Sequence, residues 1–455
     1  EVVVVGYGTQ KKVNLTGAVA QIDSKILADR PVANATQALQ GAVPNLNINF
    51  TNGRPGGEGA VNVRGFASIN SKNAAPLILI DGVPGSINNI NPRDIENISV
   101  LKDAAASAIY GARGAFGVLL VTTKKGKQGK VNVNYNNNFG FSGVTVTTNF
   151  ITNGYDAARL NDEAFIRATG NSYTGYTEDD YAELLKRKED PSLPSVVIQN
   201  RNGKEQYVYY GNTDWWDFLY RDLQTSMEHG LTISGANEKV DFYVSGRMYE
   251  KNGLMKIQQD KFNSYNLRSK VSAKVTDWLT ITNNGSTLSN TDLDIDANNN
   301  FSSTTVHGLP SYVPLNPDGT ATFRTELNNY TIGDGIMADL IHGKSKGGDK
   351  KLEFINQFEA VANLFDGFTV TGNYTYAYNP RNTFSRRTQS PWSIYPGEVS
   401  FLGYDRLNEA QITEQVYTVN LFASYNKKIK NHNFGATVGY NREHQTYKRI
   451  GGIHN

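Results

Sequence analysis

The sequence predicts a mostly β protein, a transmembrane β-barrel that encloses a small α+β domain formed by the N-terminal residues. Three observations support this fold class. The 455 residues include 43 Gly, 25 Tyr and 20 Phe, a mixture of turn formers and strand formers. From residue 131 onward, apolar and polar residues alternate over runs of about 10–15 residues, whereas globular strands average about five or six. Tight turns also alternate with long polar connections, as in outer-membrane barrels.

The first 126 residues are expected to form the α+β domain. They contain short helical and short apolar segments rather than long alternating runs. The expected elements are helices at 34–41 and 103–111 and strands at 77–80, 95–101 and 118–123. The dipeptide Asp81-Gly82 is a turn signal that closes the strand at 77–80.

The alternating segments beyond residue 130 are expected to be barrel strands. Clear examples are residues 131–141, 265–275 and 368–378, in which one face is mostly apolar and the other is mostly Asn, Thr, Ser, Lys or Arg, with Gly140 and Ala377 as exceptions. A barrel strand needs such a pattern because one face meets lipid and the other a wet lumen. Aromatic residues such as Trp278 and Phe365 fall at strand ends, where interfacial girdles lie. A soluble β-sandwich remains the alternative.

The connections between these strands fall into two classes. Tight turns are expected at 274–278, 364–368 and 427–431, and long polar loops at about 144–206, 291–351 and 379–411. We expect about ten strands after residue 130, whereas a lumen that holds a domain of about 125 residues needs about 22 strands. The chain is therefore expected to carry about half of a barrel.

Several classes of protein are disfavoured. A formal net charge of +2 gives no electrostatic reason to bind nucleic acid. The absence of Cys excludes disulfides and thiolate metal sites, and no apolar run reaches the roughly 18–20 residues of a membrane helix. No P-loop, Gly-x-Ser-x-Gly or His-Glu-x-x-His motif is present, so an enzyme is not expected.

One acidic segment offers a weak metal candidate. Asp292, Asp294 and Asp296 have the spacing of the first three ligands of a calcium loop, but Ala297 occupies the place of the required Gly. An acidic extracellular loop without a bound ion is the alternative.

The N-terminal 126 residues carry motifs of a known family. These are the segment Glu1-Val2-Val3-Val4-Val5-Gly6-Tyr7-Gly8 and, in order, residues 37–41, 61–65, 76–84 and 95–118. Together they resemble the SusC-like TonB-dependent outer-membrane transporters (the SusC/RagA family). In the barrel, residues 212–217 are also similar to a family element. The resemblance divides the chain into a TonB-box region (1–12), a plug domain (13–126) and the first part of the barrel (127–455).

The resemblance implies active import across the bacterial outer membrane, without a cofactor. TonB, with ExbB and ExbD, would bind residues 1–8 as an added strand, and the proton-motive force would move the plug. From the residues alone, an ordinary edge strand is equally possible there. The resemblance further implies a SusD-like surface lipoprotein as a lid and an oligosaccharide, or a peptide, as substrate. A siderophore-type receptor and a surface glycan-binding β protein are the alternative functions.

The plug motifs contain charged residues among small and apolar ones. Since a lone buried charge is costly, these groups must be paired or face a wet wall, and breakable pairs would suit a gate. The candidate gating and motif residues are Arg64, Asp81, Gly82, Glu96, Lys102, Asp103, Arg113 and Gly117. Static structural pairing is the alternative for each of the charges.

Substrate contacts are expected in polar plug loops and in loop aromatics. Amides and aromatic rings are the groups that commonly hold oligosaccharides. The candidates are Asn70, Asn73, Asn88, Asn89, Trp392 and Tyr395. Ordinary surface loop residues are the alternative.

Overall fold

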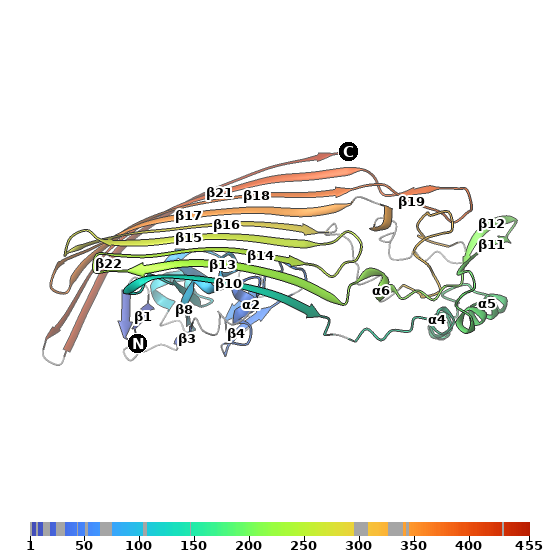
Figure 1. The fold of residues 1–455 in the computed structure, drawn as a ribbon, viewed down its shortest axis with the longest axis horizontal. Helices are drawn as coiled ribbons and strands as arrows, with labels where there is room; N and C mark the ends of the chain where they lie inside the picture. The colour runs from blue at the N-terminus through green and yellow to red at the C-terminus, as the bar shows by residue number, and fades with distance from the viewer. Residues whose placement is uncertain are drawn as a thin grey trace.

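The structure is a computed structural model in which a long curved sheet covers a small N-terminal domain (Figure 1). It describes residues 2–5, 8–11, 19–23, 32–42, 44–50, 53–63, 75–102, 107–145, 147–294, 308–325, 340–342, 345–429 and 432–455. No helix in this described part is long and apolar enough to cross a membrane.

The large sheet, here called the wall sheet, has nine antiparallel strands in sequence order. They are β10 (Gly129–Gly143), β13 (Leu223–Ala236), β14 (Val240–Asn252), β15 (Lys261–Lys274), β16 (Leu279–Asp294), β17 (Lys346–Phe365), β18 (Phe368–Arg387), β21 (Arg406–Ile429) and β22 (His432–His454). The longest has 24 residues, which agrees with the long alternating runs in the sequence.

The two faces of the wall sheet have the reverse of the usual burial. Apolar side chains on one face, such as Phe141 at 72% and Leu267 at 58%, are largely exposed. Polar residues on the other face, such as Ser264 and Arg268, are buried. The alternation therefore directs the apolar side chains away from the N-terminal domain and the polar side chains toward it.

Connections differ between the two ends of the sheet. Residues 237–239, 275–278 and 366–367 make tight turns at one end, the tight-turn end, whereas the opposite long-loop end carries 144–222 and 388–405. Two expected loops are shorter than the pattern suggested. The loop expected at 291–351 is shortened because β16 runs to Asp294 and β17 starts at Lys346. The loop expected at 379–411 is shortened because β18 runs to Arg387 and β21 starts at Arg406. In both places polar residues continue the backbone pairing of the sheet.

The N-terminal domain contains a five-stranded sheet in the order β3-β8-β9-β6-β7. Its strands are β3 (Val19–Asp23), β8 (Ile95–Leu101), β9 (Val118–Thr123), β6 (Leu77–Ile80) and β7 (Val83–Pro84), with β4 (Leu46–Asn49) and β5 (Ala60–Val63) forming a separate pair. Asp81 (φ 48°) and Gly82 (φ 83°) turn β6 into β7, as the sequence indicates.

Short helices complete the domain. They are α2 (Ala35–Leu39) and the 3-10 turns η3 (Ile87–Asn89), η4 (Pro92–Asp94) and η5 (Ala108–Gly114). The Asn34 side chain caps α2 by accepting a bond from the Gln37 amide. The expected helix at 103–111 falls partly on residues 103–106, which lie outside the described part, and its remainder belongs to η5.

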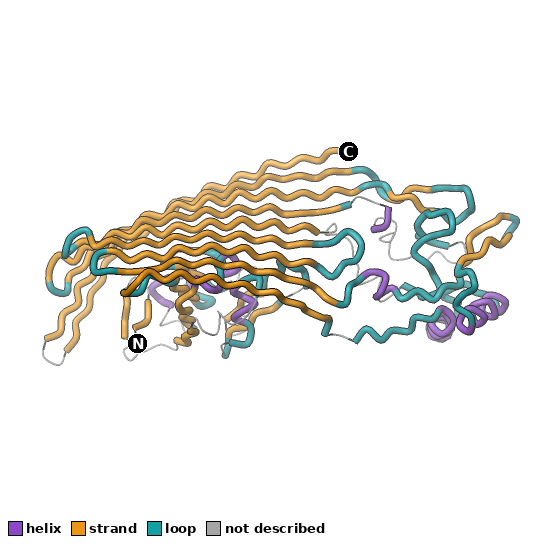
Figure 2. Tube along the Cα trace, in the orientation of Figure 1, coloured by secondary structure: helices purple, strands orange, loops and turns teal. Residues whose placement is uncertain are grey.

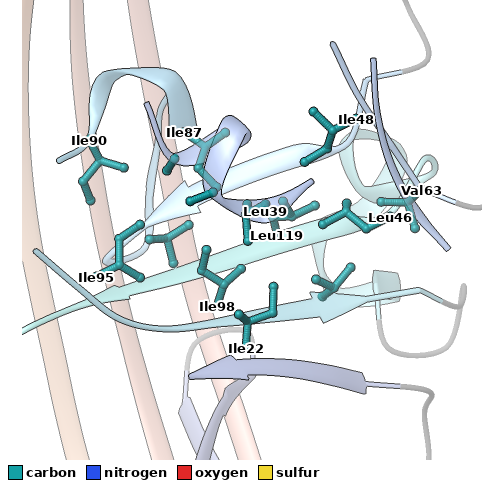
Figure 3. Packing of buried hydrophobic residues seen from close by; sticks show 14 residues of the cluster. Ile22, Leu39, Leu46, Ile48, Val63, Ile87, Ile90, Ile95, Ile98 and Leu119 are labelled. Carbon is teal, nitrogen blue, oxygen red and sulfur yellow. The ribbon is translucent and has the colours of Figure 1, made fainter. Parts of the chain in front are cut away.

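The core of the domain is a cluster of aliphatic side chains between α2, the sheet and the β4–β5 pair (Figure 3). Ile22 of β3 and Ile98 of β8 are register partners in this cluster. Both are almost fully buried. Burying such a side chain stabilises the folded state by about 1.5–3 kcal/mol. The N-terminal domain therefore has a stabilising core of its own.

Near the N-terminus, strands β1 (Val2–Val5) and β2 (Gly8–Lys11) pair in antiparallel fashion. Glu1, Gly6 and Tyr7 lie outside the described residues. The four valines therefore adopt the extended backbone that their strand propensity favours.

A further folded region lies at the long-loop end of the sheet, away from the N-terminal domain (Figure 2). It comprises α4 (Gly154–Thr169), α5 (Glu178–Glu189), β11 (Val196–Arg201), β12 (Lys204–Tyr209), α6 (Trp215–Leu219), β19 (Ser390–Trp392) and β20 (Ser400–Leu402). Thr177 and Asp180 form a capping box at the start of α5.

Candidate functional site: the interface between the N-terminal domain and the wall sheet

Among the described residues, an extensive polar network lies where the N-terminal domain meets the polar face of the wall sheet. Both sides contribute charged groups, and some of these groups form ion pairs across the interface. Strands β13 to β17 hold these groups in fixed alternate positions, and the turns of the N-terminal domain carry their partners. The network falls into three groups.

The first group surrounds Asp81 in the β6–β7 turn. Arg268 of β15 and Asn284 of β16 each donate to Asp81 Oδ2 over 2.8 Å, and the Thr123 amide donates to Oδ1 over 3.0 Å. Lys270 Nζ lies 3.3 Å from the same carboxylate. Burial alone would raise the pKa of Asp81, but Lys270, Arg268 and the hydrogen bonds from Thr123 outweigh it and lower the pKa to about 2.

The second group centres on Glu228 of β13. Arg247 of β14 donates to its Oε2 over 2.7 Å, and Arg93 of η4 donates to its Oε1 over 2.9 Å. The same Arg247 guanidinium also donates to the carbonyl oxygens of Val32 (2.8 Å) and Ala33 (3.0 Å). The Arg247 and Glu228 side chains are only 2% and 5% exposed. A buried pair of this kind is costly to break on one side, by about 3–5 kcal/mol.

The third group joins the 3-10 turns to neighbouring wall strands. Tyr243 of β14 donates to Asp94 Oδ1 over 2.9 Å, and burial raises the pKa of Asp94. Asn89 donates to Glu353 of β17 over 2.6 Å and accepts from Lys351 over 3.0 Å. The N-terminal domain is therefore bound to the wall through polar contacts on five strands, β13 to β17.

The gating candidates divide into different environments. Asp81 reaches the wall, and Arg113 pairs with Glu443 of β22 at 3.3 Å, where both side chains are partly exposed. Lys102 instead donates to the Pro44 carbonyl within its own domain over 2.7 Å. Glu96 lines a hollow of about 580 Å³ together with Arg93 and other residues. Arg64 and Asp103 lie outside the described residues.

The two glycine candidates have backbone roles. Gly82 has a φ of 83° in the β6–β7 turn. Gly117 has a φ of 94°, and a Cβ there would lie 3.2 Å from the Leu101 carbonyl oxygen and from Val63. Only glycine adopts such backbone readily, so both positions serve the shape of the N-terminal domain.

The substrate candidates are mostly engaged in contacts within the protein. Asn88 accepts a bond from Thr36, and Asn89 contacts the wall, as described above. Trp392 is 9% exposed and packs edge-on against Phe323. Lys204 Nζ lies 3.3 Å from the ring centroid of Tyr395. Asn70 and Asn73 lie outside the described residues.

The calcium candidate does not form a loop over its first two residues. Asp292 and Asp294 lie in β16, where side chains two positions apart share a face but are separated by nearly 7 Å. Asp294 forms an ion pair with Arg54 of the N-terminal domain, and Asp296 is outside the described residues. In the part of the chain that the structure describes, no group of three or more His, Cys, Asp or Glu could hold a metal ion.

Several residues of the network were not singled out from the sequence. They are Arg93, Asp94, Glu228, Arg247, Arg268, Lys270 and Glu353. One sequence signal could have identified the members of this list that lie on the wall sheet. An ionisable residue at a polar position in the middle of a membrane strand needs a nearby partner, and a domain inside the lumen is an obvious source.

The chain is similar to proteins of known families. Residues 11–118 match the family described as the TonB-dependent receptor plug domain. The chain is 33% identical to TonB-dependent receptor P26 of Formosa agariphila over 61% of this chain and 26% of that protein. It is 32% identical to TonB-dependent receptor SusC of Bacteroides thetaiotaomicron over 56% of this chain and 23% of that one. The matched part thus covers about a quarter of each relative.

Solved structures show the same fold. All of this chain superposes on half of a chain of the RagAB peptide importer in its "open-open" state, with a TM-score of 0.77 and 23% identity. Together with the family match, this confirms the expected fold class of a β-barrel with an N-terminal plug domain inside it.

Proposed function

We propose that this chain, a member of the SusC-like TonB-dependent receptors, takes part in importing a nutrient across the bacterial outer membrane through movement of its plug. The plug is the N-terminal domain described above. Residues 1–12 would form the TonB-box region, residues 13–126 the plug and residues 127–455 the first part of the barrel wall.

The observation that carries this proposal is the chemistry of the plug–wall interface. Arg268, Asn284 and Arg247 hold the plug through hydrogen bonds and ion pairs, whereas the core described above lies within the plug itself. Polar contacts lose strength steeply with distance and exchange readily with water. Such an interface favours a plug that stays in place at rest and separates from the wall under force.

The force would enter at the N-terminus. TonB, driven by the proton-motive force through ExbB and ExbD, would pair with residues 1–8 as an added strand. Strand β1, which lies within these residues, supports this idea, because its backbone is already extended. No cofactor is needed for the step. Whether calcium binds near Asp292 is a separate proposal that the strand geometry there does not favour.

The gating proposal assigns the plug charges to two roles. Asp81 and Arg113 form ion pairs with the wall residues Arg268 and Glu443, and these pairs would break during opening. Lys102 contacts only the plug among the contacts described for it, so we assign it to plug stability. Glu96, Arg64 and Asp103 remain candidates for either role.

The substrate is proposed to be an oligosaccharide, with a peptide as the second candidate. A peptide is kept because the importer with a similar fold is named as a peptide importer. A SusD-like surface lipoprotein would cover the long-loop end, where residues 147–222, together with Met255, Leu309, Tyr312 and Leu340, build a folded region with its own buried clusters. Asn70, Asn73, Asn88, Asn89, Trp392 and Tyr395 stay as candidate contacts. Of these, Trp392 and Asn89 would have to leave their present partners.

Deleting residues 1–8 tests the proposed coupling. We expect uptake of the substrate to be abolished while binding at the cell surface stays intact. A finer variant is Val4→Pro, which removes one backbone donor from the strand, with Val4→Ala as the matched control. Undiminished uptake in the deletion variant would refute TonB coupling. Calorimetry with a panel of oligosaccharides and peptides would then decide the substrate class.

A further inference from the structure

The hollow of about 580 Å³ that Glu96 lines, here called the basic hollow, lies between the plug and the start of the wall sheet. Among the described residues, its lining has five cationic side chains and the carboxylate of Glu96 alone. The whole chain has a formal net charge of only +2, so the basic hollow concentrates positive charge. The cations are Arg93, Lys124, Lys125, Lys127 and Lys130.

The backbone that carries the four lysines, residues 124–130, is held between the plug and the wall. The Lys124 amide donates to the Asp94 carbonyl oxygen over 2.8 Å, which places Lys124 beside η4. Gly126 is buried, and a Cβ there would collide with a backbone carbonyl of β13. Gly129 then begins β10 and pairs with β13 at the tight-turn end (Figure 1). The lysines are therefore gathered by the fold and not only by the sequence.

The cations of the basic hollow have few negative partners. Arg93 donates from Nε to Glu228 over 2.9 Å. The four lysines of residues 124–130 form no ion pair with any residue in the part of the chain that the structure describes. Three of them, Lys125, Lys127 and Lys130, are exposed, so their ammonium groups are accessible to a ligand.

The environment of Lys124 shows the cost of this crowding. Burial lowers the pKa of its ammonium group, and the positive charges of Arg93 and Lys127 lower it further, whereas Asp94 and Glu96 oppose the change. Like charges that are held together favour an ion of opposite sign. An anion bound among these groups would therefore remove part of their repulsion.

The wall side of the basic hollow supplies neutral hydrogen-bonding groups. Asn132 and Asn134 of β10 stand opposite Ser234 and Thr232 of β13 in the sheet register, and all four line the hollow. Such amides and hydroxyls can bond to the hydroxyl groups of a sugar, while lysines bind its acidic groups as point charges. The volume of about 580 Å³ lies within the roughly 300–1,000 Å³ of small-molecule sites.

We propose that the basic hollow is an exit subsite for an acidic oligosaccharide, an inference that rests on the import function proposed above. Its lysines would bind the carboxylate or sulfate groups of the substrate, as in a chain that contains uronic acid. Tight turns face the periplasm in outer-membrane barrels, so a substrate that has passed the plug would meet this hollow last. Contacts from exposed lysines are screened by salt, which lets the substrate leave.

Lysine footprinting of the complete receptor in detergent tests this inference. Acylation of each lysine is followed by mass spectrometry, with and without a uronic acid oligosaccharide. At about ten times the dissociation constant, acylation of Lys125, Lys127 and Lys130 should slow by about tenfold. Lys428 is the control within the same molecule, because it is exposed at the same end but does not line the hollow. Its rate should not change.

Calorimetry with matched variants measures the affinity. The double variant Lys125→Gln/Lys127→Gln should weaken binding of the uronic acid oligosaccharide on the order of tenfold or more, whereas Lys428→Gln should leave it unchanged. Both hollow lysines are exposed, so the double variant should fold. A neutral oligosaccharide of equal length, an acidic peptide and inorganic sulfate separate the sources of the anion. Equal or better protection of the hollow lysines by any of these three would overturn the proposal.

The remaining outcomes are also decisive. Unchanged acylation of the hollow lysines, or equal slowing at Lys428, would overturn the proposal. Hollow lysines that are unreactive without a ligand would overturn it too, because a hollow closed to the reagent is closed to an oligosaccharide. Footprinting and calorimetry need no TonB. A failure of this subsite is therefore distinguishable from a failure of TonB-coupled import, which the uptake assay with residues 1–8 deleted would reveal.

Discussion

Replacing Asp81 with Asn should loosen the plug from the wall. The substitution preserves the shape of the side chain and one oxygen that can accept the bond from the Thr123 amide. It removes the negative charge that Arg268 and Lys270 share. Two wall cations would then face a neutral group.

The size of the effect follows from the pKa of Asp81. A value of about 2, against the ordinary 3.8, corresponds to about 2.5 kcal/mol of preferential stabilisation of the charged form. This contribution is complete above the ordinary pKa and is lost as the pH falls from about 4 to about 2. At neutral pH, Asp81→Asn should therefore raise the local opening constant of the plug roughly 60-fold.

Hydrogen exchange in outer-membrane vesicles measures this opening. The amides of the β6–β7 hairpin, such as Gly85, which donates to the Ile78 carbonyl, should lose protection by that factor. Asp366→Asn is the matched control, because the Asp366–Lys427 pair lies in an exposed turn and should matter little. Protection unchanged in Asp81→Asn, or lost equally in the control, would refute the reasoning.

Two further substitutions in the plug have predictable effects. Asp94→Asn should leave protection unchanged or raise it, because burial raises the pKa of Asp94 and an amide still accepts the bond from Tyr243; a loss like that of Asp81→Asn would contradict this. Gly117→Ala should destabilise the plug by about 1–3 kcal/mol, because its φ is 94° and its Cβ would press on Val63. Thermal unfolding would measure this change, with Gly53→Ala, which has open space around it, as the control. Equal melting of the two glycine variants would show that backbone strain is not the cause.

The wall sheet was predictable from the sequence because its signal is local. Alternation over residues 265–275 places Leu267 outward and Arg268 inward without knowledge of any other strand, and the structure has this arrangement. The ends of strands were harder to predict. Polar residues near Asp294 and Lys346 resemble a loop, yet they continue the ladder because backbone pairing does not depend on side-chain polarity.

The site was predictable only in part because its contacts are distant in sequence. Asp81 stands out as a charge in a turn, but its partner Arg268 is 187 residues away. The Arg247 bond to the Val32 carbonyl spans 215 residues and ends on a backbone atom. Nothing in the local composition at Val32 indicates such a partner. These contacts follow from the fold as a whole and not from any one segment.

The buried charges of the wall also bear on assembly. Arg268 and Lys270 lie on β15, and the carboxylate that both of them bind, Asp81, belongs to a domain encoded earlier in the same chain. The N-terminal domain thus serves the barrel as an internal counterion. A wall that closed before this domain entered would have to keep those charges hydrated and then strip the water away. Folding is easier if the two parts meet while the sheet is still open.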